Sequence, residues 1–434
     1  MPRSAFRGSI LHFLSDPGEG EAASAYRYLD DGLLLIENGC VAALGPAPDL
    51  LPGLPPGTPV ADHRGCLMVP GFVDTHIHYP QTDVIGCAGW QLLDWLERCT
   101  FPAERAFRDP AHARAVADFF LDELLRNGTT TALVFGTVHP ESVDAFFAAA
   151  AARGLRMICG KVLMDRNCPD DLRDTPESGY RDSAALIERW HGAGRLHYAI
   201  TPRFAVTSSD EQLALAGKLA RERPEVHIHS HVAENVEEVR RARELFPARR
   251  SYLDVYDHFG LLRERAVYAH CIHLDAGDRQ RMAQSGAAAS FCPTSNLFLG
   301  SGLFDLAAAD AAGYRVGVGT DVGGGTSFSM LRTLAEAYKV LQLRGQRLSS
   351  LRAFYLATLG GARALRLDDR IGSFAPGREA DFVVLDPAAT PLLARRSAGA
   401  RSLAERLALF TTLGDERCVR QVYVEGRPAR LPAA

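Results

Sequence analysis

The sequence lacks features that define several large classes of protein. No apolar run in its 434 residues is long enough to cross a bilayer. It has no basic cluster and no segment that interleaves aromatic residues with Arg or Lys, and its formal net charge is -4, so nothing in it attracts nucleic acid or an anionic membrane. Residues 1–7 lead into a short strand-like piece, not into the apolar core of a signal peptide. We therefore expect a cytoplasmic protein whose partners are small molecules.

The cysteines exclude two further classes. There are 9 of them, an odd number, and no two form a Cys-x-x-Cys pair. This pattern argues against a disulfide framework and against a zinc ribbon. We expect reduced thiols, so any bound metal must be held by histidine and carboxylate.

What the sequence does contain is a long alternation of strand-like and helix-like segments. With 47% hydrophobic residues the chain buries a large core, and it is too long for one typical domain unless that domain is a barrel. The predicted strands cover 67–76, 129–135, 155–164, 197–204, 226–232, 266–272, 287–292 and 314–320. Helices are predicted between them at 111–126, 141–152, 210–222 and 234–245, and after the last strand at 328–343. About eight strand-helix units over roughly 250 residues are typical of a (β/α)8 barrel, although a doubly wound open sheet gives a similar alternation.

The two ends of the chain differ from the middle. Asn38-Gly39 is a strong hairpin turn between the apolar runs of 33–44, and residues 380–385 and 421–426 read as short strands. Neither end is large enough to fold alone. We predict that residues 1–66 and 371–434 form the two parts of one small β-sandwich, and that residues 67–370 form an α/β, TIM-type barrel.

Several predicted barrel strands end in a residue that is costly to bury without a partner. These residues are His76 and His78 on the first strand, Arg203 on the fourth, His231 on the fifth, His270 on the sixth and Asp321 on the eighth. Barrel enzymes place their chemistry at the carboxyl ends of the strands. We therefore expect these side chains to converge on one mouth, which favours the barrel over the open sheet.

His76 and His78 are the start of a candidate metal site. Residues two apart on a strand point to the same face, and neutral imidazoles at that spacing suit Zn²⁺ or Fe²⁺. A bare His-x-His is more often a satisfied core histidine beside a loop histidine. The metal interpretation becomes the stronger one only because His231 and Asp321 end other strands.

Glu234 follows His231 by three residues, at the start of the next helix. There it lies close to the predicted metal, although an ordinary first-turn glutamate facing the helix dipole fits the same position. His227 and His229 share the strand face of His231, and we interpret them as packing or supporting groups.

Together these motifs resemble the amidohydrolase superfamily and, within it, the barrel-type guanine deaminase family. The superfamily resemblance rests on residues 70–78 (Pro-Gly-Phe-Val-Asp-Thr-His-Ile-His), on His231, His270 and Asp321, and on 371–383. The narrower resemblance rests on Gln81, on Trp95-Leu96 running to Thr100-Phe101-Pro102-Ala103-Glu104, and on the segments 127–131, 201–204, 230–235, 292–297 and 319–324. His229, Cys271 and His273 depart from the residues expected at their positions.

The resemblance implies one Zn²⁺ per subunit and a homodimer. The implied metal ligands are His76, His78, His231 and Asp321, and the implied catalytic residues are Glu234, Asp321 and His270. The implied substrate contacts are His78, Gln81, Arg203, Phe204, His231 and Asp321.

The implied reaction is hydrolysis of guanine to xanthine and ammonia, as in purine catabolism. Zn²⁺ lowers the pKa of its water to ~7. Asp321 would take the proton of that water, while Glu234 would protonate ring atom N3 and help the amine leave from C2. The cytidine-deaminase signature, His-x-Glu with Pro-Cys-x-x-Cys, is absent.

The base itself would be held by polar and apolar groups. Arg203 donates to ring acceptors, and the amide of Gln81 both donates and accepts. Phe204 offers an apolar surface to the ring, with Trp90, Leu93 or Phe101 as weaker candidates.

Two alternatives stay open. The substrate could be another amino-heterocycle, such as a pterin, an oxidised purine or a triazine. The chain could also be a catalytically silent scaffold on the same fold, although such proteins typically lose ligands and every predicted position is retained here.

Overall fold

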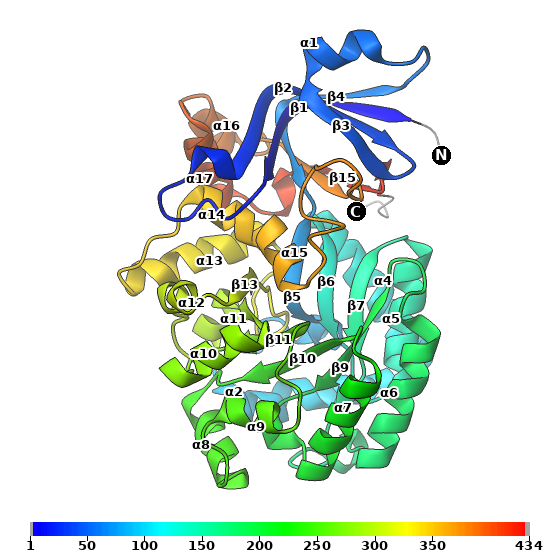
Figure 1. Ribbon diagram of the computed structural model, residues 1–434, viewed down its shortest axis with the longest axis vertical. Helices are drawn as coiled ribbons and strands as arrows, with labels where there is room; N and C mark the ends of the chain where they lie inside the picture. Colours follow the sequence, from blue (N-terminus) through cyan, green and yellow to red (C-terminus); the bar gives the residue numbers. More distant parts are fainter. Residues whose placement is uncertain (1–2, 430–434) are drawn as a thin grey trace.

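The computed structural model describes residues 3–429, which form a parallel barrel and a mixed sheet built from both ends of the chain (Figure 1). The barrel strands run in the order β13-β12-β11-β10-β9-β7-β6-β5, and β8 pairs with β9. Their bounds are β5 (Phe72–His78), β6 (Thr129–Phe135), β7 (Arg156–Gly160), β8 (Val162–Leu163), β9 (His197–Pro202), β10 (His227–Val232), β11 (Ala266–His270), β12 (Ala288–Phe291) and β13 (Arg315–Val318).

The barrel closes between its first and last strands. The N–H of Asp321, just after β13, donates to the carbonyl of His76 over 2.9 Å, and the N–H of His78 donates to Val322 over 2.9 Å. This closure confirms the predicted barrel and excludes the open doubly wound sheet. It also places the two candidate histidines of β5 beside Asp321.

Helices cover the outside of the barrel because each has one apolar face. In α4 the buried residues Ala113, Ala117, Phe120, Leu121 and Leu124 recur at helical spacing. The helices of this part are α2 (Leu92–Trp95), α3 (Phe101–Glu104), α4 (Pro110–Arg126), α5 (Pro140–Ala152), α6 (Pro176–Trp190), α7 (Asp210–Glu222), α8 (Val236–Leu245), α9 (Tyr252–His258), α10 (Ala276–Ser285), α11 (Pro293–Phe298), α12 (Leu306–Ala312), α13 (Met330–Leu343), α14 (Ser350–Tyr355) and α15 (Gly361–Ala364).

The second layer is a seven-stranded sheet in the order β16-β15-β14-β4-β1-β2-β3, drawn above the barrel in Figure 1. It contains the predicted hairpin, with Asn38 and Gly39 both at positive φ in the turn between β2 and β3. Its elements are β1 (Ser4–Phe13), β2 (Tyr26–Glu37), β3 (Cys40–Pro46), β4 (Val60–Pro70), β14 (Phe382–Leu385), β15 (Val419–Val424) and β16 (Arg427–Pro428), with α1 (Ala47–Leu50), α16 (Pro391–Ser397) and α17 (Leu403–Leu413). Both ends of the chain therefore share one small β-layer.

The strand predicted over 67–76 is wrong in one respect, because the structure divides it between the two sheets. Leu67–Pro70 ends β4 and pairs with β14, whereas Phe72 begins β5 in the barrel. Gly71 lies between them, and a Cβ at this position would overlap the side chain of Thr130. A continuous apolar run gives no sign of this change of sheet, since both halves are fully buried.

Ion pairs that are largely shielded from solvent join the two layers. Glu379, next to β14, accepts hydrogen bonds from Arg156 Nε at 2.7 Å and from Arg195 Nη2 at 2.6 Å, and Arg195 also pairs with Asp381. The side chains of Arg156 and Glu379 are 3% and 13% exposed. These contacts tie the start of barrel strand β7 to the end sheet.

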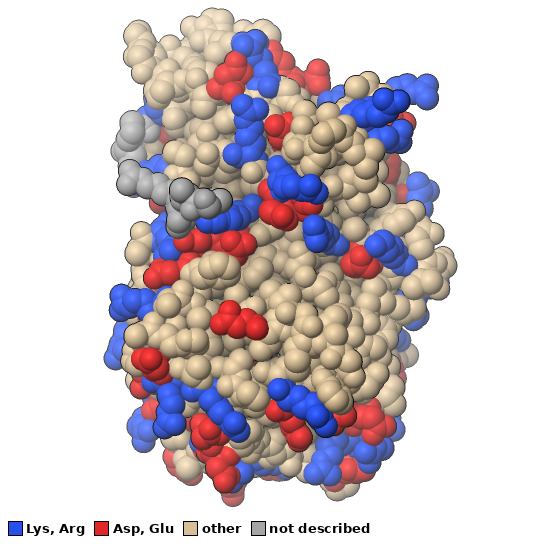
Figure 2. Space-filling model, turned by 180° about the vertical axis from the view of Figure 1, so that it is seen from behind, with Lys and Arg blue, Asp and Glu red and all other residues tan. Residues whose placement is uncertain are grey.

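The surface agrees with the charge pattern of the sequence. On the face shown in Figure 2, basic and acidic side chains are interspersed, and neither sign forms a continuous patch. Within residues 3–429 no helix is both long and apolar enough to span a bilayer.

Candidate active site

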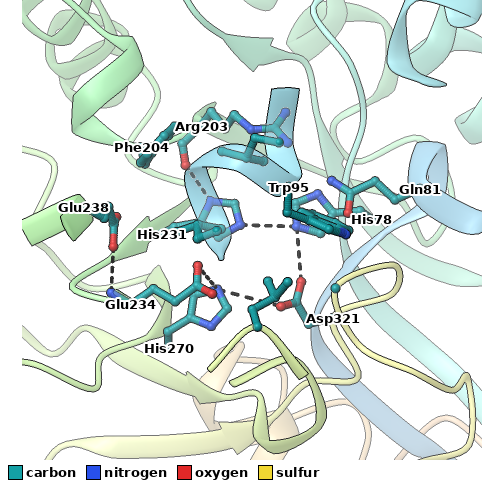
Figure 3. Close-up of a pocket in the computed structure, with 14 residues that line it drawn as sticks. His78, Gln81, Trp95, Arg203, Phe204, His231, Glu234, Glu238, His270 and Asp321 are labelled. Carbon is teal, nitrogen blue, oxygen red and sulfur yellow. Dashed lines mark hydrogen bonds and ion pairs between the residues drawn. The ribbon is translucent and has the colours of Figure 1, made fainter. Parts of the chain in front are cut away.

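A pocket at the carboxyl ends of the barrel strands gathers most of the predicted site residues (Figure 3). Its lining comprises His78, Gln81, Leu92, Trp95, Leu96, Arg203, Phe204, His231, Glu234, Glu238, His270, Leu299, Asp321 and Gly324. His76 lies directly behind His78 and is fully buried.

The imidazoles of β5 and β10 point at one another. His78 Nε2 lies 3.2 Å from His76 Nε2 and 3.2 Å from His231 Nε2. Alternation along β5 gives His76 and His78 the same face, and the parallel strands bring His231 to the same level.

Asp321 completes this cluster from the loop after β13. Its Oδ1 lies 3.1 Å from His76 Nε2 and 3.3 Å from His78 Nε2. Burial alone would raise the pKa of this carboxyl, but the charge of His76 and hydrogen bonds from His76 and His78 hold the pKa well below its ordinary value. Both Asp321 (φ 53) and His270 (φ 71) have a left-handed backbone, a strain of about 1–3 kcal/mol each of the kind that collects at functional sites.

Hydrogen bonds on the far side of three of the rings, those of His76, His231 and His270, determine which nitrogen faces the pocket. His231 Nδ1 donates to the carbonyl of Arg203 at 2.6 Å, and His270 Nδ1 donates to Asn296 Oδ1 at 2.9 Å. His76 Nδ1 lies 2.7 Å from His229 Nε2, which assigns His229 a supporting role. Each of these bonds leaves Nε2 to face the other ligands.

The donor set fits a metal ion. Nδ1 or Nε2 atoms of His76, His231 and His270 and a carboxylate oxygen of Asp321 all lie within 4.8 Å of one another, and His78 adds its Nε2 to the same cluster. Burial lowers the pKa of His78 to about 3 and that of His231 well below its ordinary value, so both imidazoles are neutral and able to bind metal. The structure thus brings together the four predicted ligands and adds His270, the fifth member of the cluster.

Glu234 approaches the cluster from the turn before α8. Its Oε2 lies 3.3 Å from His270 Nε2, and its Oε1 accepts the hydroxyl of Ser301 at 2.9 Å. Burial, together with the charge of Asp321, raises the pKa of Glu234 to about 8. The turn is held by Glu238, whose Oε2 accepts the backbone N–H of Glu234 at 2.8 Å. A carboxyl with such a pKa holds or releases a proton near neutral pH.

Three polar and aromatic residues face the cluster from the other side of the pocket. Arg203 and Phe204 follow β9, and Gln81 follows β5 (Figure 3). The Oε1 of Gln81 accepts the N–H of Gly323 at 3.2 Å, which joins the loop after β5 to the loop that carries Asp321.

The weaker aromatic and apolar candidates lie elsewhere. Trp90 is 40% exposed, and Leu93 and Phe101 line a neighbouring hollow. The apolar wall of the pocket comes instead from Leu92, Trp95 and Leu96. These residues have i, i+3, i+4 spacing and so share one helical face, a signal that becomes usable only once the helix is known.

The segment that contains Leu92, Trp95 and Leu96 also contains a disulfide, contrary to the expectation of reduced thiols. Cys87 and Cys99 form a disulfide, and the other seven cysteines are free. Trp95 donates its indole N–H to the carbonyl of Cys87 at 2.9 Å within the same closed loop. The expectation that all thiols are reduced is therefore wrong for this pair. The helical segment between residues 87 and 99, which includes α2, brings the two cysteines together, and their spacing in the sequence does not predict this.

Comparisons with known proteins agree with this geometry. The family model described as Amidohydrolase family matches residues 67–429. Guanine deaminase of Escherichia coli (strain K12) is 55% identical over 426 residues, which cover 98% of this chain and 97% of that protein. The solved structure of E. coli guanine deaminase superposes with a TM-score of 0.97 at 53% identity, covering 99% of this chain and 100% of that one. A guanine deaminase from C. acetobutylicum with guanine bound in its active site superposes with a TM-score of 0.89 at 28% identity, covering 99% and 100%.

Proposed function

The chain belongs to the amidohydrolase family, and from this premise we propose that it hydrolyses guanine to xanthine and ammonia. The observation that carries the proposal is the convergence, in one pocket, of a histidine-aspartate cluster, an acid with a raised pKa, and polar and apolar side chains suited to a flat heterocyclic base. The relatives named above share nearly the whole length of the chain and carry that activity in their names.

We propose Zn²⁺ as the metal, one per subunit, held by His76, His78, His231 and Asp321. Tetrahedral zinc with bonds of about 2.0–2.1 Å separates its ligand atoms by about 3.3 Å. The Nε2 atoms of the three histidines and Oδ1 of Asp321 include separations of 3.1 to 3.3 Å, which supports this set. Zn²⁺ bound there would supply a water that ionises near neutral pH.

The purine is proposed to lie between Phe204 and the metal ligands. The guanidinium of Arg203 donates to ring and carbonyl acceptors, and the amide of Gln81 pairs with a neighbouring donor and acceptor on the base. Phe204 packs on a ring face, while Trp95 and Leu96, which also line the pocket, exclude water from it.

Two carboxyl groups are proposed to move the protons. Asp321 Oδ2, which lies 3.8 Å from His270 Nε2, accepts a proton from the attacking water. Glu234 Oε2 protonates ring atom N3 as the water oxygen bonds to C2. The resulting carboxylate takes the proton of that C2 hydroxyl and passes it to the amine, so that the C–N bond breaks, ammonia leaves and the C2 carbonyl forms; the proton held by Asp321 then restores Glu234. His270, held by Asn296 and adjacent to both carboxyl groups, orients the attacking water or the new carbonyl oxygen.

The test is ammonia release from guanine by purified protein whose zinc is quantified on the same sample. Protein that contains one zinc per chain and releases no ammonia would exclude the proposal. A panel with a pterin, an oxidised purine and a triazine separates guanine from the other amino-heterocycles, and absence of bound metal would favour the silent scaffold. The homodimer is a further proposal, which sedimentation of the metal-loaded protein tests.

A further inference from the structure

Glu104 is a fully buried acid that the proposed reaction leaves without a role. It ends the short helix α3, and its carboxylate touches two of the residues assigned to the purine. Arg203 Nη1 donates to Glu104 Oε1 at 2.9 Å and to Oε2 at 2.8 Å. Gln81 Nε2 donates to Glu104 Oε1 at 3.3 Å.

We propose that Glu104 is a positioning and specificity-determining residue, which orients Arg203 and Gln81 together and cancels the charge of the guanidinium so that the pocket prefers an uncharged base. This inference rests on the proposed function, because that function assigns the two partners to the purine.

The positioning argument follows from the hydrogen-bonding capacity of each partner. Arg203 uses Nη1 on Glu104, and within residues 3–429 no side-chain hydrogen bond from its Nε or Nη2 is found, so these atoms are left for a ligand. Gln81 is held at both ends of its amide, by Glu104 on Nε2 and by the N–H of Gly323 on Oε1. The orientation of this amide is therefore determined by its neighbours, and one N–H and one lone pair are left for the base.

The same short helix restrains the guanidinium plane. The ring of Phe101, three residues before Glu104, lies 5.4 Å from Arg203 Cζ. Stacking on one side and the carboxylate at one end leave the guanidinium little freedom to rotate.

The specificity argument follows from charge and burial. The side chains of Arg203 and Glu104 are 2% and 1% exposed, so water does little to screen either charge. Alone, a buried guanidinium would attract an anion such as urate, the oxidised purine that is negatively charged at neutral pH. Paired with Glu104 it presents N–H donors with no net charge, which suits guanine, an uncharged base.

The experiment compares three variants of the full-length, zinc-loaded protein. In Glu104→Gln the charge is lost, and kcat/KM for guanine should fall roughly 10- to 100-fold, the loss expected for a charged hydrogen bond, mainly through KM. Inhibition by urate should become at least several-fold tighter, while the zinc content stays at the wild-type level. Glu104→Asp keeps the charge but shortens the side chain, so its KM should rise without tighter urate inhibition. Glu97→Gln, on the exposed side of the same segment, should match the wild type in every measurement.

The outcomes separate the possibilities. Glu104→Gln with wild-type KM and wild-type urate inhibition overturns the proposal, and so does a loss confined to kcat or thermal stability, which a purely structural role would produce. If Glu104→Gln fails to fold, the double variant Glu104→Gln/Arg203→Met removes both buried charges. It should lose affinity for guanine and bind urate no tighter than the wild type, and tighter urate binding would overturn the charge argument. If the wild type does not turn over guanine, the proposed function fails, and calorimetric binding of guanine and urate to wild type and Glu104→Gln still tests Glu104 itself.

Discussion

Replacing Glu234 by glutamine removes the proposed proton carrier and changes the shape of the side chain very little. The side chain is 2% exposed, its Oε2 lies 3.3 Å from His270 Nε2, and its Oε1 accepts the hydroxyl of Ser301. Glutamine has the same shape and keeps an oxygen for Ser301, but it cannot give up or take a proton at neutral pH. General acid-base catalysis by one side chain is worth about 10²- to 10⁴-fold, which corresponds to about 3–5 kcal/mol in the activation barrier. We therefore expect Glu234→Gln to lower kcat for guanine by that factor.

The assay is steady-state ammonia release, with zinc per chain and the thermal midpoint measured on the same preparation. Glu237→Gln is the matched control, because its carboxylate lies on the exposed face of α8 and pairs with Arg240, away from the pocket. Its kcat should equal that of the wild type. A Glu234→Gln enzyme that retained wild-type kcat would refute the proton role, and one that lost its zinc along with its activity would show that Glu234 acts through the metal site.

Other substitutions test the proposed metal site, the ion pairs between the barrel and the end sheet, and the disulfide. His231→Ala removes a proposed ligand, so elemental analysis should find most of the zinc lost, and full retention would contradict the assignment. Glu379→Gln leaves buried Arg156 and largely buried Arg195 without their shared carboxylate, which should cost about 3–5 kcal/mol in the free energy of unfolding measured with urea. Although burial raises the pKa of Glu379, its arginine partners hold the pKa below its ordinary value. The stabilisation by Glu379 is therefore complete above the unfolded pKa of about 4.3 and is lost as the pH falls through the folded pKa. The free energies of unfolding of the variant and the wild type should therefore become equal in acid. A difference that stays constant with pH would argue against the ion pair. Cys87→Ser opens a loop whose paired cysteines are 12 positions apart in the sequence, with an expected loss of about 3 kcal/mol in the free energy of unfolding. Nine titratable thiols in unreduced, denatured wild type would show that the bond is not formed.

The local pattern of apolar and polar residues was sufficient to predict most strands and helices of the barrel. The strand at 129–135 and the helix at 210–222 have the predicted bounds, because strongly apolar runs and a capped amphipathic stretch are local signals. The change of sheet at Gly71 was missed because it depends on the close approach of Thr130, which is distant in the sequence. The structure of segment 79–104 could not be predicted either, since its short helical turns and its disulfide are stabilised by contacts with the rest of the barrel mouth.

By itself, the sequence determined the kind of fold, the residues with metal-binding chemistry and the family resemblance. Strand ends, histidine spacing and motif order are all features of the linear sequence. Tertiary structure alone decided how those residues act together. Closure of the barrel brings Asp321 to the histidines of β5. The backbone carbonyl of Arg203 and the side chain of Asn296 select the imidazole nitrogen with which His231 and His270 face the pocket. It also decided that Glu104, one acid among many in the sequence, lies buried against Arg203 and Gln81. The physical reason is that hydrogen bonds and charge pairs act over a few ångströms, and only folding brings residues more than twenty positions apart within that range.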